Sequence, residues 1–339
     1  MLRPIFIDNT NGLLTLVGLI FILIGCNQPE TKLVDHSIEK SEAEIQKPTS
    51  LYAELAYLTQ AKLGEGALWN HKTQTFWWID IEGKQFNIYD PKTHKNRIHP
   101  TKTRIGTVVP STDGNAILAT EEGILDYNIN DKTSTLINPL ETDIKNNRLN
   151  DGKCDPEGRL WVGSMNSNTT SPTGSLYKVS GSESTKMLDS IKISNGIVWT
   201  QDHKTMYYID TPTGEIMAYN YDNSTGEITK GRVAVSIPKT LGFPDGMAID
   251  INDNLWVGMW NGNAVINFDP RTGKTIQTIN VPAHNVTACA FGGPNLDTLY
   301  ITTARIDMSP AELDSLPLSG SLFKCLPGVK GVEASFYVK

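Results

Sequence analysis

The sequence predicts an all-β fold, a six-bladed β-propeller, and three observations support this prediction. A unit of roughly 40 to 50 residues, which reads as four short strands, recurs six times along the chain. Turn signals such as "TDGN", "PEGR" and "TGK" separate segments in which apolar residues alternate with polar ones, as strand hairpins require. Amphipathic spacing typical of a helix of useful length does not occur. Repeats of this length with four strands each are typical of propeller blades.

The six copies can be followed in order along the chain. They are represented by "GALWNHKTQTFWWIDI", "TVVPSTDGNAILATEEGILDYNIN", "NDGKCDPEGRLWVGSM", "NGIVWTQDHKTMYYID", "DGMAIDINDNLWVGMW" and "VTACAFGGPNLDTLYITTA". We expect one propeller domain over residues 51–339, with a segment near 52–62 completing the last blade and closing the ring. The tryptophans of the second strands favour packing between blades over a sugar-stacking platform. These are Trp77, Trp78, Trp161 and Trp256.

The N-terminus predicts export. Residues 12–25, "GLLTLVGLIFILIG", have the length of a signal-peptide core and are too short to span a bilayer comfortably. "LIGC" resembles a bacterial lipobox, which would make Cys26 the lipidated first residue of the mature chain. We therefore predict a signal peptide over 1–25, then lipidated Cys26 and a flexible tether over 26–50. The expected location is a bacterial membrane, in the periplasm or at the outer membrane. An uncleaved anchor is the alternative.

The charge and the cysteine content limit the binding partners and the disulfide bonds that we expect. The formal net charge of −7 and the lack of a Lys/Arg stripe argue against nucleic acid, so we expect membrane contact only through the lipid anchor. Apart from Cys26, three cysteines remain, Cys154, Cys289 and Cys325, and no CxxC occurs. An odd number does not build a disulfide framework, so we expect buried free thiols.

Polar residues recur where each innermost strand begins. Innermost strands line the central channel of a propeller, so their starts meet around one mouth. The six positions are Glu65, Thr107, Asn150, Asn195, Asp245 and Thr287. Two carboxylates with carboxamide oxygens suit one hard divalent cation, Ca²⁺ first, with Mg²⁺, Mn²⁺ or Zn²⁺ as alternatives. Arg148 lies two positions before Asn150 and shares its face, so it would hold a ligand oxygen or pair with a neighbouring blade.

Five motifs carry a resemblance to a known family. They are "GEGALW", "RLNDGKCDPEGRLWVGSM", "ISNGIVWT", "PDGMAID" and "VTACAFGGPNLDTLYITTA". In this order they resemble the regucalcin/gluconolactonase family, from about residue 58 to the C-terminus. The resemblance implies a six-bladed propeller with one catalytic divalent metal on its axis, acting on sugar lactones.

The resemblance also implies roles for single residues. Glu65, Asn195 and Asp245 match the metal ligands of the family, and Asp245 matches its proposed general base. Arg148 and Asn150 match its substrate contacts. Members related to regucalcin carry a sugar-binding glutamate in the loop after the second strand of the third blade. Asn168 stands at that position here and is the expected substrate contact, so the identity of the sugar does not carry over.

The predicted function is metal-dependent hydrolysis of a small sugar lactone by activated water, with Asp245 as the general base. A GxSxG nucleophile motif is absent from the sequence. Two alternatives use the same mouth: a paraoxonase-like esterase or organophosphate hydrolase, and a propeller that binds a ligand without catalysis. A third, a lipid-anchored structural subunit, rests on Cys26 alone.

Overall fold

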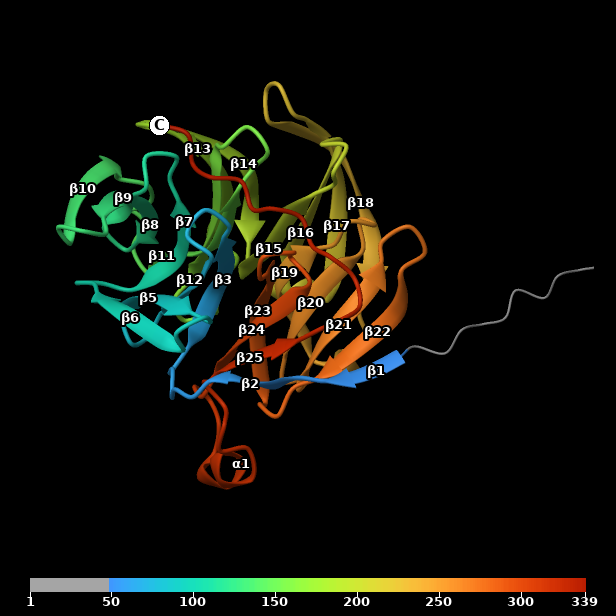
Figure 1. Ribbon diagram of the computed structural model, residues 1–339. Helices are drawn as coiled ribbons and strands as arrows, with labels where there is room; N and C mark the ends of the chain where they lie inside the picture. The colour runs from blue at the N-terminus through green and yellow to red at the C-terminus, as the bar shows by residue number, and fades with distance from the viewer. Residues whose placement is uncertain (1–48) are drawn as a thin grey trace, which may run out of the picture. The chain divides into compact units, whose positions relative to one another are not determined.

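The computed structural model describes residues 49–339, and these residues fold into six β-sheets that follow one another around a ring (Figure 1). This confirms the predicted six-bladed propeller. The first three blades consist of β3 (Gly64–Asn70), β4 (Thr75–Asp80), β5 (Gln85–Asp90) and β6 (Lys95–Pro100); β7 (Ile105–Pro110), β8 (Ala116–Thr120), β9 (Gly123–Asn128) and β10 (Thr133–Asn138); and β11 (Asn147–Cys154), β12 (Leu160–Asn166), β13 (Gly174–Ser180) and β14 (Glu183–Ile191).

The last three blades repeat this antiparallel pattern. They consist of β15 (Ser194–Trp199), β16 (Thr205–Asp210), β17 (Glu215–Asp222) and β18 (Glu227–Ser236); β19 (Phe243–Ile249), β20 (Leu255–Trp260), β21 (Ala264–Asp269) and β22 (Lys274–Asn280); and β23 (Asn285–Gly292), β24 (Thr298–Ala304), β25 (Leu322–Cys325) and β2 (Glu54–Tyr57). The short helices are η1 (Thr211–Thr213), η2 (Lys239–Leu241) and α1 (Pro310–Ser315). Within residues 49–339 no helix is both long enough and apolar enough to span a bilayer.

The N-terminal strands close the ring. Strand β2 pairs antiparallel with β25 as the outer strand of the sixth blade, with Glu54 opposite Lys324. This is the closure expected for the segment after residue 51. Strand β1 (Thr49–Tyr52) pairs parallel with β22, so regular structure begins two residues before the expected boundary. The predicted signal peptide and Cys26 lie outside the described residues, as does the tether up to residue 48, and they stay predictions.

Aspartates hold the turns between the first two strands of two blades. Asp155 accepts hydrogen bonds from the backbone N–H groups of its own turn, at Glu157 and Arg159, and its second oxygen accepts from Trp161 Nε1 at 2.9 Å. Asp250 does the same in the fifth blade, with Trp256 Nε1 at 3.0 Å. The predicted blade tryptophans are at most 2% exposed, so they pack between strands and offer no platform for a sugar.

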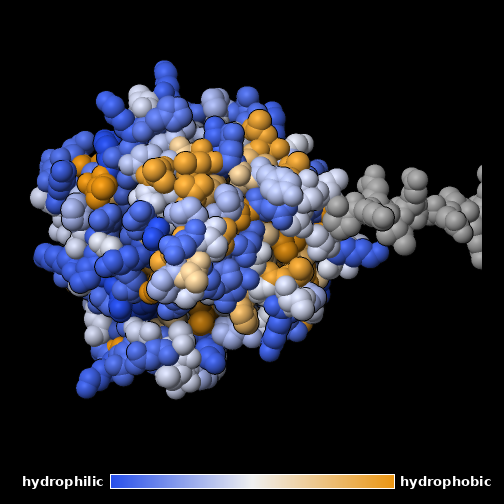
Figure 2. Space-filling model, turned by 90° about the horizontal axis from the view of Figure 1, so that it is seen from below, coloured by the Kyte–Doolittle hydropathy of each residue, from blue (hydrophilic) through white to orange (hydrophobic). Residues whose placement is uncertain are grey.

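The character of the surface and the state of the cysteines also agree with the composition. Seen from below, hydrophilic residues cover most of the molecular face and hydrophobic residues form smaller patches between them (Figure 2). Cys154, Cys289 and Cys325 are buried free thiols, as the sequence predicted.

The C-terminal strap, residues 327–339, crosses one end of the ring (Figure 1). Its backbone is tied to the fifth blade, where Ile251 N–H donates to Lys330 O. It is also tied to the second blade, where Tyr337 N–H donates to Pro110 O at 2.8 Å. The strap therefore spans the channel on the side where the innermost strands end.

Candidate active site

A cavity of about 420 Å³ lies at the other end of the ring, where the innermost strands begin. Each of the six innermost strands contains a register shift near its start. The shifts fall between Glu65 and Leu68, Ile105 and Thr107, Leu149 and Gly152, Asn195 and Ile197, Pro244 and Met247, and Val286 and Cys289. Such bulges turn a side chain away from its usual face and are frequent beside active sites. Here they accompany the polar residues at the predicted mouth.

Two glycines allow neighbouring innermost strands to approach each other closely. A Cβ atom on Gly196 would lie 2.7 Å from Met247 Cβ and 2.8 Å from Asp245 O. A Cβ atom on Gly246 would lie 2.5 Å from Ala288 Cβ. Real side chains do not tolerate these distances, so only glycine fits directly after Asn195 and Asp245.

Glu65 and Asp245 form a buried carboxyl pair in this cavity. They are 8% and 5% exposed, respectively, and lie close enough for each to affect the pKa of the other. Burial raises the pKa of Glu65 to about 8, and the nearby Asp151 carboxylate adds to the shift. Burial also raises the pKa of Asp245 well above its usual value, with Glu65 as the next cause. The pair therefore has a strong tendency to bind a proton or another cation.

A chain of hydrogen bonds joins the third blade to the fifth. Arg148 Nη1 donates to Asn150 Oδ1 at 2.6 Å, and Asn150 Nδ2 donates to Asn195 Oδ1 at 3.2 Å. Asn195 Nδ2 donates to Thr211 Oγ1 at 2.7 Å, and Thr211 donates to Pro244 O at 2.8 Å. This chain fixes the side chains of the expected substrate contacts relative to an expected metal ligand.

Two further aspartates hold the loops that enter the site. Asp80, at the end of β4, accepts from Leu63 N–H at 3.0 Å, two residues before Glu65. Asp210, at the end of β16, accepts from Ile193 N–H at 2.9 Å, two residues before Asn195. In both blades, therefore, an aspartate at the end of the second strand positions the start of the innermost strand, and with it the side chain of Glu65 or Asn195.

The structure brings together most of the predicted site residues. Glu65, Arg148, Asn150, Asn195 and Asp245 all line the cavity. Within residues 49–339, no histidine or cysteine lines it.

The two mouth threonines lie deeper in the ring. Thr107 donates to Gly152 O at 2.9 Å and Thr287 to Gly64 O at 2.6 Å, so each joins two innermost strands without lining the cavity.

The loop after β12 differs from the expectation for Asn168. Asn168 is exposed and does not line the cavity, whereas its neighbours Ser167 and Thr169 do. The turn begins at Asn166, whose Oδ1 accepts from Asn168 N–H at 3.0 Å, and this bond turns the backbone at Asn168. Hydroxyl groups beside Asn168, instead of its amide, are the groups this loop presents.

Four charged residues in or beside the cavity were missed from sequence, and Asp307, which lines it, is one of them. Asp151 is a third buried carboxyl group, and burial raises its pKa. Glu82 and Arg104 line the cavity and pair with each other. Asp151 directly follows Asn150 in the "RLNDGK" motif, which was a usable signal. Glu82 and Arg104 lie in connections between strands, where the sequence does not indicate which way a side chain points.

The residues suit a divalent cation by their chemistry. No group of three or more His, Cys, Asp or Glu side chains within residues 49–339 is arranged to hold a metal ion. Glu65 and Asp245 supply two carboxyl groups, and Asn195 would add an amide oxygen, the donor types that Ca²⁺ and Mg²⁺ prefer. Neither carboxyl group forms an ion pair with a described Lys or Arg residue. The donor set therefore fits a cation without displacing a salt bridge.

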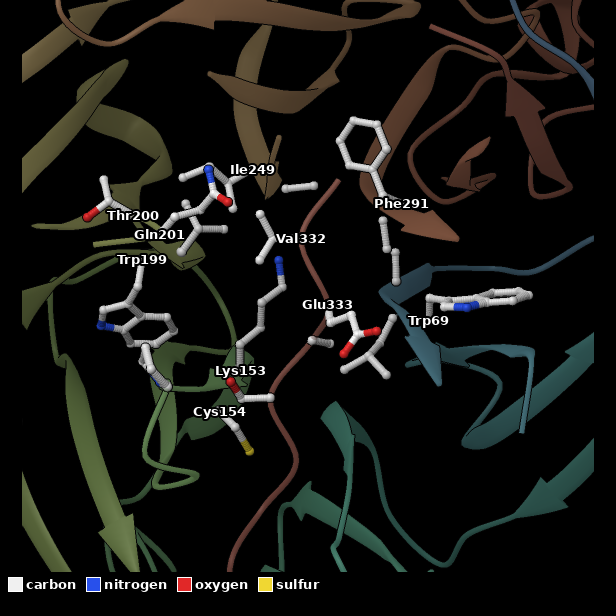
Figure 3. A pocket seen from close by; sticks show the side chains of 18 of the residues that line it. Trp69, Lys153, Cys154, Trp199, Thr200, Gln201, Ile249, Phe291, Val332 and Glu333 are labelled. Atoms are coloured by element: carbon white, nitrogen blue, oxygen red, sulfur yellow. The ribbon is translucent and has the colours of Figure 1, made fainter. Parts of the chain in front are cut away.

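A second cavity, of about 150 Å³, lies at the opposite ends of the same strands. Figure 3 shows Lys153 reaching toward Val332 of the strap between Trp199 and Trp69. Lys153 Nζ donates to Met247 O, and burial lowers its pKa. This cavity lacks the facing carboxyl groups of the first, so we place the candidate active site at the first.

Fold and site together define a propeller whose mouth, on the axis of the ring, is lined by carboxyl groups. The chain belongs to the SMP-30/Gluconolactonase/LRE-like family, whose profile matches residues 63–305. It is 38% identical over 266 residues to the Bacillus subtilis protein assigned as sugar lactone lactonase YvrE, covering 78% of this chain and 91% of that one. It is 36% identical over 283 residues to Xenopus laevis regucalcin, covering 81% and 95%. The structure of the calcium-binding protein regucalcin from Agrobacterium tumefaciens matches with a TM-score of 0.82 at 27% identity, over 86% of this chain and 99% of that one.

Proposed function

We propose that this protein hydrolyses a sugar lactone in the cavity that holds Glu65 and Asp245. The observation that carries the proposal is the buried carboxyl pair beside Arg148 and Asn150 in one cavity of about 420 Å³. Membership of a family that includes gluconolactonases, and a relative assigned as a sugar lactone lactonase, support the choice of substrate class.

The metal dependence is part of the proposal. A divalent cation held by Glu65, Asn195 and Asp245 would supply Lewis-acid polarisation of the ester carbonyl. Ca²⁺ is our first choice because the Agrobacterium tumefaciens relative is described as calcium-binding. Mg²⁺, Mn²⁺ and Zn²⁺ remain the alternatives to test.

Asp245 is the proposed general base. Its carboxylate accepts a proton from the water that attacks the carbonyl carbon. Burial and Glu65 raise the pKa of Asp245 in the metal-free protein, and a bound cation would lower it again and keep the carboxylate ionised, as a base must be. The ring C–O bond then breaks, the proton held by Asp245 passes to the ring oxygen, which leaves as a hydroxyl group, and the product is a hydroxy acid.

Arg148 and Asn150 are the proposed substrate contacts. The hydrogen bonds of Arg148 to the described chain all come from Nη1, so Nε and Nη2 are left to face a ligand. Burial, with Arg104 as the next cause, lowers the pKa of Arg148 to about 10, so its guanidinium stays charged at neutral pH. It can therefore stabilise the negative charge that develops on the carbonyl oxygen.

A second candidate has one observation in its favour. Apolar side chains, including Met165, Phe243 and Trp260, line part of the cavity, which would suit the more apolar substrates of a paraoxonase-like esterase. Acid release from aldonolactones, aryl esters and a phosphotriester, with and without added divalent ion, separates the candidates. We expect aldonolactones to be hydrolysed fastest. Preference for aryl esters or the phosphotriester would favour the esterase, and no turnover together with no bound ion would favour a binding propeller.

A further inference from the structure

Glu82 and Arg104 form an ion pair at the rim of the active-site cavity, and both side chains line it. Glu82 lies in the turn between β4 and β5, and Arg104 directly precedes β7. Arg104 donates from Nε to Glu82 Oε1 at 2.9 Å and from Nη2 to Oε2 at 3.2 Å. A two-point contact of this kind fixes the plane of the carboxylate.

The paired carboxylate still has room for a ligand. Each carboxylate oxygen offers about two acceptor sites, and Arg104 occupies one on each oxygen. The Glu82 side chain is 26% exposed, so its remaining acceptor sites are not enclosed by protein. An ionised carboxylate only accepts hydrogen bonds, so its partner must be a donor such as a hydroxyl group.

The charges of the cavity favour a neutral donor. Four carboxyl groups line the cavity, those of Glu65, Glu82, Asp245 and Asp307, against the two guanidinium groups of Arg104 and Arg148. A divalent cation would neutralise Glu65 and Asp245, so the charge that a substituent meets near the rim is set by Glu82 and Asp307, and the Glu82 carboxylate would repel an anionic substituent placed against it. A cationic substituent at Glu82 would meet Arg104, which already neutralises that carboxylate. Hydroxyl groups carry neither penalty.

We propose that Glu82, oriented by Arg104, is a specificity residue that accepts hydrogen bonds from the ring hydroxyl groups of an uncharged lactone. The inference rests on the proposed lactone hydrolysis and adds to it which lactones are selected. It places the acceptor on the first blade, while the loop after β12 contributes the hydroxyl groups of Ser167 and Thr169.

The test compares Glu82→Gln with Glu121→Gln. Glu121 also contacts Arg104, with Arg104 Nη1 donating at 3.5 Å, but it does not line the cavity. The substrates are D-glucono-1,5-lactone, which carries ring hydroxyl groups, and δ-valerolactone, which carries none; spontaneous hydrolysis is subtracted. For Glu82→Gln we expect KM for the hydroxylated lactone to rise about tenfold, with kcat and the kcat/KM of δ-valerolactone within about twofold of the parent. Glu121→Gln should change either KM less than about threefold.

Several results would overturn the inference. Equal losses of kcat/KM for both lactones, no loss for either, or the same effect from Glu121→Gln would each contradict a direct contact between Glu82 and a hydroxyl group.

If the parent protein hydrolyses no lactone, the proposed function fails, and a binding experiment then tests the inference on its own. Titration calorimetry with 1,5-anhydro-D-glucitol, a sugar ring without the carbonyl, should show binding that Glu82→Gln weakens about tenfold. Tetrahydropyran should show no difference between the proteins. Equal binding of the sugar ring by both proteins, or no binding to either, would overturn the inference.

Discussion

Asn150 donates a hydrogen bond from Nδ2 to Oδ1 of Asn195, 3.2 Å away, across the boundary between the third and fourth blades. The same Nδ2 donates to Ser194 O at 2.7 Å. One side chain therefore connects the strand that carries the proposed substrate contacts to the strand that carries a proposed cation ligand. The effect of a substitution at Asn150 on substrate turnover can therefore be measured separately from its effect on cation binding.

Truncation of Asn150 to alanine tests this division. We expect kcat/KM for an aldonolactone to fall about 100-fold, because the change removes the only side-chain acceptor of Arg148 among the described residues and a substrate contact. The Kd for the divalent ion, measured by calorimetry, should rise less than about fivefold. Asn130→Ala, in an exposed hairpin, is the matched control. Equal loss in both measurements would place Asn150 among the cation ligands.

The pH dependence of stability follows from the carboxyl pair. The raised pKa values of Glu65 and Asp245 mean that the metal-free folded protein binds protons more tightly than the unfolded chain. Its stability is therefore greatest below the unfolded pKa, near 4.3 for glutamate, and falls as the pH rises to about 8. Thermal unfolding in chelator should show Tm decreasing across this range. Glu65→Gln should flatten the decrease, and Glu227→Gln, at an exposed ion pair, should leave it unchanged.

Metal removal gives a prediction that does not depend on variants. A cation would relieve repulsion between Glu65 and Asp245, so chelated protein should lose lactone hydrolysis by more than about tenfold and regain it with one of the four ions. The same ion should raise Tm at pH 8, by mass action on the folded state. Activity unaffected by chelation, in protein shown by elemental analysis to be metal-free, would contradict the proposed metal dependence.

Asp210 provides a test of loop positioning. Asp210→Asn keeps the shape but weakens the acceptor for the N–H groups of Lys192 and Ile193. We expect a loss of about 1 to 2 kcal/mol in the free energy of unfolding, measured in urea, because the acceptor is charged. We also expect kcat/KM to fall about tenfold, because Asn195 is displaced. Asp222→Asn, which holds an exposed turn through Ser224, should leave kcat/KM unchanged.

The sequence was sufficient to predict the blades and four of the six mouth positions as cavity-lining residues. The repeat length fixed the phase of each innermost strand, so counting from one Gly-containing motif to the next located Glu65, Asn195 and Asp245. Thr107 and Thr287 were harder to predict, because small side chains reach the neighbouring strand instead of the cavity.

Turn residues could not be predicted in the same way. Glu82, Arg104 and Asn168 lie where the chain reverses, and a single hydrogen bond such as that at Asn166 decides which side chain faces the cavity. Spacing along the sequence contains no information on such bonds between neighbouring blades. Asp151 differs from these residues because the direction of its side chain depends on the bulge in β11. The repeated glycines indicate that a bulge occurs there, but they do not fix the register of the strand.

The C-terminal strap covers one end of the ring and leaves the end with the candidate active site open. The strap and the Lys153 side chain line the cavity at the far end, so we expect substrate and product to use the opening at the candidate active site. The active-site cavity can hold either the lactone or the hydroxy acid at one time. The hydroxy acid formed in one turnover should therefore compete with the next lactone for the same cavity. We expect simple competitive product inhibition, because the hydroxy acid would occupy the same cavity beside Arg148.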